Sequence, residues 1–183
     1  MSLTAAVLLA TLPFPASGGG ETVGAARTDP SMAVLEAHNI ERASIGLSAM
    51  RWDPSLAAGA ADYARTMAVT GRWGHSAHED RPGQGENLWM GTRAAFHPTE
   101  MVDAWIAEKR DVRPGVFPNV SSTGSWQDVG HYTQMVWPET ERMGCAIRSS
   151  LQADYLVCRY AAPGNVMGTR ISFAGARPAQ AGA

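Results

Sequence analysis

Two cysteines in the C-terminal third of the chain restrict its fold more than any other feature. Cys145 and Cys158 lie in two strand-like runs, MGCAIRSS and ADYLVCRY, which are separated by Leu151 and Gln152. If the runs form a β-hairpin centred there, residues whose numbers sum to 303 face each other, and 145 plus 158 is 303. The two Cα atoms would then lie roughly 5 Å apart, within disulfide reach. The sequence therefore predicts an antiparallel hairpin closed by a Cys145–Cys158 disulfide.

The N-terminal segment has the pattern of a secretory signal peptide. Residues 1–11 read MSLTAAVLLAT and are followed by two prolines and the small residues ASG, although the positively charged n-region is missing. The apolar run is too short to span a bilayer. We expect residues 1–18 to be removed on export, residues 19–30 to form a flexible spacer, and the mature protein to be extracellular. An oxidising compartment also favours the disulfide over two buried free thiols.

The rest of the chain has the size and composition of one globular domain. Of its 183 residues, 45% are hydrophobic and 17% are charged, which suits a single core. The net charge is −2 and basic residues form no run, so nothing indicates binding to nucleic acid or to an anionic membrane surface. We expect the domain to span residues 31–168, without stable insertion into a membrane. Residues 169–183 are rich in Gly, Ala and Pro and are predicted to be a disordered tail.

Local signals predict three helices and a short strand ahead of the hairpin. The first helix is expected over residues 31–45 with Ser31 as its cap, and the second over residues 54–70 behind Asp53 as cap. The third helix opens at Pro98 and runs to about Arg110, and residues 87–90 read as a strand.

A histidine at the head of an apolar run raises the question of function. His131 begins the stretch HYTQMVW, and a core rarely accepts an imidazole that has no partner. Glu108 is one candidate partner, because it shares a helical face with Met101 and Trp105 at i, i+4 and i+7. Periodicity leaves a second reading open, in which Glu108 sits at the edge of that face and reaches water.

Two further polar residues complete a candidate group of four. His75 lies in a Gly-rich loop and Glu86 lies just before the predicted strand. Imidazoles and carboxylates together can ligate a divalent ion or act as an acid–base pair. The separations of 11, 22 and 23 residues along the group match no local metal motif, so the spacing alone equally allows solvated loop residues.

Other kinds of chemistry receive less support. The serines near these residues (Ser76, Ser121, Ser122 and Ser125) occupy no Gly-x-Ser-x-Gly elbow. The glycines of RPGQGEN lack the lysine of a phosphate-binding loop. The tryptophans (Trp73, Trp89, Trp105, Trp126 and Trp137) could line an apolar groove or simply form core.

Four stretches, taken in order, resemble the motifs of the CAP superfamily, which comprises the cysteine-rich secretory, antigen 5 and pathogenesis-related 1 proteins. They are HNIER, GENLW, GHYTQMVW and YLVCRYAAPGNV, and together they span roughly residues 31–168. The resemblance implies an α+β fold, an α-β-α sandwich with a small antiparallel sheet between helical layers. It also implies that the stretch at His131 is a short helix rather than a strand.

The resemblance further implies a central cleft faced by His75, Glu86, Glu108 and His131. His75 and His131 would be the metal-binding residues for a weakly bound, zinc-like divalent ion, with Glu86 and Glu108 beside them. The family's elaborated members carry more disulfides and an additional Cys-rich module, and neither is present in this sequence. Channel-directed or receptor-directed activities of those members are therefore not expected here.

Three functions follow as expectations. The first is an extracellular binding module for a small apolar ligand, such as a lipid or sterol, or for a partner protein. The second is a metal-dependent, peptidase-like hydrolase in which Glu86 and Glu108 are the catalytic candidates. The third is a secreted scaffold without catalysis. Binding ranks above catalysis because the sequence shows no activated nucleophile, and the sequence does not predict an oligomeric state.

Overall fold

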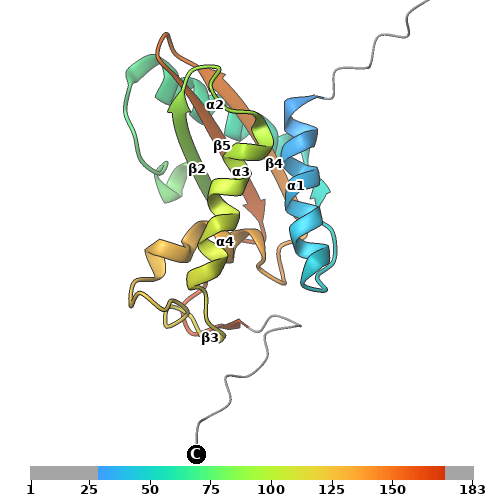
Figure 1. Ribbon diagram of the computed structural model, residues 1–183. Coiled ribbons are helices and arrows are strands. Elements are labelled where there is room, and N and C mark those ends of the chain that lie inside the picture. The colour runs from blue at the N-terminus through green and yellow to red at the C-terminus, as the bar shows by residue number, and fades with distance from the viewer. Residues whose placement is uncertain (1–28, 172–183) are drawn as a thin grey trace, which may run out of the picture.

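A mixed β-sheet lies between two helical layers in the computed structural model, which describes residues 29–171 (Figure 1). Helices α1 (Pro30–Ser44), α3 (Pro98–Ile106) and α4 (Gly130–Met135) lie on one side of the sheet. Helix α2 (Pro54–Thr70) covers the other side. This is the expected α+β sandwich. The predicted signal peptide and nearly all of the predicted spacer lie outside the described residues.

The sheet is built around the predicted hairpin. Its strand order is β1 (Arg51–Trp52), β4 (Arg142–Ser149), β5 (Ala153–Ala161) and β2 (Gly85–Thr92). The pairs β4–β5 and β5–β2 are antiparallel, whereas the short β1 runs parallel to β4. The sheet is therefore mixed, and the expectation of a wholly antiparallel sheet was wrong for β1.

The predicted register of the hairpin is confirmed. Cys145 faces Cys158 across β4 and β5, their Cα atoms are 4.1 Å apart, and they form a disulfide. By closing a loop of this length, the disulfide stabilises the fold by roughly 3 kcal/mol on the chain-entropy model.

Alternation along the strands separates two hydrophobic clusters. Cys145, Leu156 and Tyr160 pack toward α1, α3 and α4, whereas Ala146 and Val157 pack toward α2. This two-residue period is what a strand buried on both faces requires. A third cluster forms beneath the pair β3 (Gly115–Val116) and β6 (Arg170–Ile171). Strand β6 falls within the segment predicted to be a disordered tail, so the ordered domain continues past residue 168.

Capping residues explain where two helices begin. The side chain of Asp53 accepts hydrogen bonds from the amides of Ser55 and Leu56 and caps α2, as predicted. The cap of α1 is Asp29 and not Ser31, because the Asp29 carboxylate accepts the Ser31 amide at 2.9 Å. Pro30 then occupies the first helical position, where its missing N–H costs nothing.

The third helix is shorter than predicted and changes type. Helix α3 ends at Ile106 and continues as the 3₁₀ helix η2 (Ala107–Asp111). Because a 3₁₀ helix has three residues per turn instead of 3.6, Glu108 is no longer related to Met101 and Trp105 by the spacing of one continuous α-helix. Two further 3₁₀ helices are η1 (His78–Asp80) and η3 (Trp126–Val129). Between residues 29 and 171 no helix is long and apolar enough to cross a membrane.

Candidate functional site

A cavity of about 680 Å³ opens where the loop after α2, the start of β2 and the start of α4 meet. His75 belongs to that loop, Glu86 to β2 and His131 to α4, and all three line the cavity. Glu108 does not line the cavity and reaches it only through its contact with His131. The structure therefore brings the four predicted residues together as two histidine–glutamate pairs.

The first pair, His131 and Glu108, is fixed by the backbone of α4. Glu108 Oε1 lies 2.6 Å from His131 Nδ1, and Glu108 Oε2 accepts the amides of His131 and Tyr132, both at 3.0 Å. The carboxylate thus satisfies two of the amides that the start of a helix leaves unpaired. The ring of Trp105 stacks on the ring of His131, with centroids 5.8 Å apart and an interplanar angle of 16°. Glu108 therefore fixes both the ring nitrogen and the amide of His131, and Trp105 packs against the face of its ring.

The second pair, His75 and Glu86, is fixed by the buried carboxylate of Glu86. His75 Nδ1 lies 2.8 Å from Glu86 Oε1, and the Glu86 side chain is fully buried while that of His75 is half exposed. Ser76 donates its amide and its hydroxyl to the same carboxylate, at 3.0 and 2.9 Å. Arg159 Nε lies 3.0 Å from Glu86 Oε2 as an ion pair rather than as an aligned hydrogen bond.

The environment keeps Glu86 ionised. Burial alone would raise the pKa of this carboxyl, but the hydrogen bond from His75, the charge of Arg159 and the two bonds from Ser76 lower it below its ordinary value. An anionic Glu86 accepts the Nδ1–H of His75. Glu108 is placed to receive the Nδ1–H of His131 in the same way, and in the neutral form of either imidazole this leaves the lone pair on Nε2.

This arrangement has a definite chemical capability. A neutral imidazole held through Nδ1 can bind a metal ion or accept a proton through Nε2. Neither carboxylate is free to act directly on a ligand, because each is engaged by an imidazole and by backbone amides. Among residues 29–171, no group of three or more His, Cys, Asp or Glu side chains is placed to hold a metal ion. His78 also lines the cavity, but it forms no three-ligand group with His75 and His131, so the donor set considered for a metal is the two imidazole nitrogens of the glutamate-bound histidines.

The other predicted chemistry is not assembled around the cleft. The Ser76 hydroxyl donates to Glu86 and accepts from Arg159, so it is not activated as a nucleophile. Ser121 is hydrogen-bonded to Thr123 and does not line the cavity. The tryptophans do not form one groove. Trp105 and Trp137 are buried in different clusters, Trp126 lines the cleft, Trp73 is exposed, and Trp89 packs against Phe96.

The HNIER stretch holds the structure behind the cleft, a role that the sequence did not assign to it. The side chain of Asn39 bonds both backbone groups of Met50, at 3.0 and 2.8 Å. Glu41 accepts from the Tyr132 hydroxyl at 2.7 Å and from Lys109 at 2.9 Å, which ties α1 to α4 and η2. The signal for these roles was four polar residues within one helical turn of an otherwise packed helix. What each contacts depends on segments far away in the sequence.

His38, from the same stretch, lies in the core and not in the cleft. It is fully buried, its Nδ1 donates to the Val34 carbonyl at 2.8 Å, and its Nε2 accepts from the Tyr160 hydroxyl at 2.9 Å. Burial lowers the pKa of His38 from 6.5 to about 4; the Val34 bond opposes this shift and the nearby Arg42 charge adds to it. His38 therefore stays neutral in the folded protein while the unfolded chain takes up a proton.

We expect this histidine to make stability depend on pH. As pH falls below 6.5, the unfolded state binds a proton that the folded state binds only near pH 4, so stability decreases with decreasing pH. By pH 5 the loss from His38 is roughly 2 kcal/mol, before most carboxylates titrate. Urea unfolding at pH 7 and pH 5 measures it. The matched variant His38→Gln is less stable at pH 7 but should lose this part of the pH dependence; an unchanged pH dependence would contradict the assignment to His38.

The sequence comparisons identify relatives over most of the described chain. The sequence model of the Cysteine-rich secretory protein family (CAP) matches residues 35–160. A pathogenesis-related protein of the PR-1 type from Sambucus nigra is 36% identical over 137 residues, covering 74% of this chain and 78% of that protein. Human peptidase inhibitor 16 is 35% identical over 161 residues, but the match spans only 33% of that longer protein.

A solved structure is similar in fold. The crystal structure of NaASP2 with Zn²⁺ superimposes with a TM-score of 0.67 at 26% sequence identity. The match covers 78% of this chain and 85% of the NaASP2 chain.

Proposed function

Because the chain belongs to the Cysteine-rich secretory protein (CAP) family, we propose that it acts outside the cell as a binding module whose cleft holds a divalent metal ion between His75 and His131. Family membership supports the α+β fold and an extracellular location. The metal, its ligands and the molecule bound by the cleft are the new part of the proposal.

The observation that carries the proposal is the matched state of the two histidines. Each imidazole gives its Nδ1 to a glutamate, at 2.8 Å for His75 and 2.6 Å for His131, and both rings line the same cavity. A carboxylate on Nδ1 orients the ring and makes Nε2 a better metal donor. Two such nitrogens facing one cavity fit a borderline ion such as zinc. A relative in fold has been crystallised with Zn²⁺, which supports the choice of metal.

The number of donors sets the expected affinity. With two imidazole nitrogens as protein ligands, zinc binding is modest and the fold does not depend on it, unlike in structural sites with four ligands. The open coordination positions would accept oxygen atoms of a ligand, which the ion would polarise as a Lewis acid.

The cleft favours a polar ligand over the apolar one expected from the resemblance. Its lining is dominated by histidines, glutamines, asparagines, Arg81 and backbone, and only Ala77, Trp126 and Pro163 add apolar side chains. A lipid or sterol would offer no hydrogen-bond partner to those polar groups that face the cavity, which costs free energy wherever such a group has no partner in the protein. We therefore assign the cleft to metal and polar ligand, and an apolar ligand would require another surface of the protein.

The hydrolase alternative receives less support from the geometry. Two neutral imidazoles could act as general bases toward water. Ser76 is fully engaged by Glu86 and Arg159, however, and neither carboxylate faces the cavity free of other contacts. We therefore rank binding above catalysis.

Isothermal calorimetry with zinc alone tests the proposed site. The parent protein should bind one zinc ion, and the double variant His75→Ala with His131→Ala should lose this binding while keeping its circular dichroism spectrum. Glu108→Gln should weaken zinc binding by roughly 10-fold, since partners of metal ligands typically contribute 10–100-fold. Because neutral imidazole is the ligating form, the parent's affinity should also decrease as pH is lowered.

The control is a histidine outside the cleft. His97 caps α3 and is exposed, and His97→Asn removes an imidazole while keeping a residue that caps well. This variant should bind zinc as the parent does. Zinc binding by the double variant at the parent's affinity would reject the site, because the zinc would then be bound elsewhere on the protein.

A further inference from the structure

A line of buried polar side chains runs through the core and ends behind His131. His38 accepts the hydroxyl of Tyr160 at 2.9 Å, and the side chain of Asn87 interacts electrostatically with the same hydroxyl. Asn87 Nδ2 also donates to the carbonyl of His131 at 3.0 Å. The three residues come from α1, β5 and β2, and each is at most 1% exposed. The line thus links three elements of the fold to the first turn of α4.

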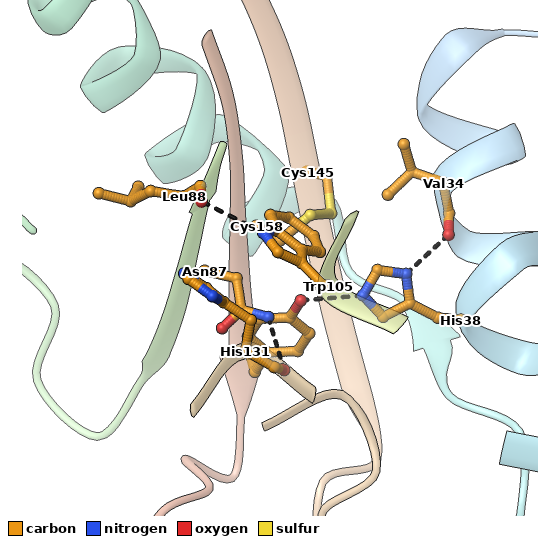
Figure 2. Close-up of a disulfide and its surroundings, with 9 residues drawn as sticks. Val34, His38, Asn87, Leu88, Trp105, His131, Cys145 and Cys158 are labelled. Carbon is orange, nitrogen blue, oxygen red and sulfur yellow. Dashed lines mark hydrogen bonds between the residues drawn. A yellow bond between two sulfur atoms is a disulfide. The ribbon is translucent and has the colours of Figure 1, made fainter. Parts of the chain in front are cut away.

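Trp105 provides a second contact between His38 and His131. Its ring stacks on His131 and meets the ring of His38 edge-on, with centroids 6.0 Å apart. Its Nε1 donates to the Leu88 carbonyl at 3.2 Å, which fixes the indole against β2. Figure 2 shows these bonds beside the disulfide, with Trp105 drawn between Leu88 and His38.

The short helix that presents His131 depends on such ties. Helix α4 has only six residues, and its cap residue provides no side-chain hydrogen bond. Isolated helices of this length are unstable, so contacts from outside must fix its position. Glu108 holds its first amides and Asn87 holds the carbonyl of His131. Burying three polar side chains is costly unless they pair, and apolar residues would fill the same space more cheaply.

We infer that His38, Tyr160 and Asn87 are positioning residues, which set the orientation of His131 in the cleft through the Asn87 bond to its carbonyl and through Trp105, packed between His131 and the His38–Tyr160 pair. The inference rests on the proposed function for its purpose, but the positioning itself is a property of the metal-free protein. His75 serves as an internal reference, because it lies in the loop after α2 and is held by Glu86, not by Glu108 or Asn87. A loss of this line should therefore disturb His131 and leave His75 unchanged.

The test uses Tyr160→Phe, which removes one hydroxyl and keeps the ring. In the metal-free full chain, the imidazole Cε1–H signal of His131 in a proton–carbon NMR spectrum should move away from its parent position, while that of His75 should not. Zinc affinity by calorimetry should fall about 10-fold, at the lower end of what partners of metal ligands contribute. The matched control is Tyr155→Phe, the same change in the same strand on the face toward α2, and it should alter neither signal nor affinity.

Two more variants separate positioning from general damage. Asn87→Ala should reproduce the selective change at His131, and it tests the inference even if Tyr160→Phe fails to fold. His38→Gln keeps an acceptor for the Tyr160 hydroxyl and should preserve the His131 signal, whereas His38→Leu should not. A selective His131 change in a protein that binds no zinc supports the positioning and rejects the proposed metal. An unchanged His131 signal in Tyr160→Phe and Asn87→Ala, or equal changes at His75 and His131, overturns the inference.

Discussion

Arg42→Met is expected to lower the free energy of unfolding by about 4 kcal/mol or more. The Arg42 side chain is buried and donates four hydrogen bonds, to the carbonyls of Ser48, Met135, Trp137 and Thr140, at 2.8–3.1 Å. The Ser48 carbonyl follows α1, whereas the other three belong to the end of α4 and the segment after it, and of these the Trp137 carbonyl also accepts the amide of Thr140 at 3.2 Å. Methionine fills similar space but leaves the buried carbonyls of Met135 and Thr140 unpaired, at roughly 1–3 kcal/mol each before relaxation.

Thermal unfolding followed by circular dichroism measures this effect. A loss of about 4 kcal/mol corresponds to a decrease of roughly 10–15 °C in the midpoint for a domain of this size. The control is Arg51→Met, because the Arg51 side chain is 76% exposed and lies 3.7 Å from an equally exposed Glu141. That variant should stay within about 0.5 kcal/mol of the parent. Equal midpoints for the two variants would show that the buried guanidinium does not hold this region.

Gly144→Ala is expected to cost about 3 kcal/mol or more, and it tests how closely α2 packs on β4. A Cβ atom at Gly144 would lie 2.2 Å from the amide nitrogen of Ala57 and 2.6 Å from the carbonyl oxygen of Asp53. Both atoms are backbone, so no side-chain rotation relieves the overlap. The start of α2 would have to move away from the sheet, which disturbs the cluster beneath it.

Gly59→Ala is the matched control for this substitution. Gly59 lies inside α2, and an added Cβ there meets nothing within 4 Å. Alanine is the better helix former, so this variant should be more stable than the parent by roughly 0.5–1 kcal/mol. Denaturant unfolding of both variants gives the comparison. A Gly144→Ala variant as stable as the parent would mean that α2 and β4 are not in close contact in solution.

Much of the fold was predictable because its signals are local. The hairpin register follows from two cysteine positions, since pairing in an antiparallel hairpin is fixed once its centre is known. The start of α2 follows from Asp53 followed by proline, which satisfies the first amides of a helix in any surroundings. The resemblance of four motifs supplied the layering, which no single segment contains.

Two of the local predictions were wrong, one because of a neighbouring residue and one in a segment that makes tertiary contacts. Ser31 is a good capping residue, but Asp29 takes the role once Pro30 occupies the first helical position. The periodicity of Met101 and Trp105 left open whether Glu108 lies on the apolar face or at its edge, and it predicted one continuous helix. The chain instead tightens to a 3₁₀ helix, and the Glu108 carboxylate binds the amides at the start of α4.

The sequence by itself determined the main helices, the hairpin with its disulfide and, through the resemblance, the four residues that form the two histidine–glutamate pairs. Only the tertiary structure decided how those residues pair, His75 with Glu86 and His131 with Glu108, and which ring nitrogen each histidine offers. It alone also revealed that His38 and Arg42 act in the core. The physical reason is that a cap or a hairpin register is settled between near neighbours in the chain, whereas a buried polar side chain is defined by partners such as Tyr160 that only folding brings within hydrogen-bond distance.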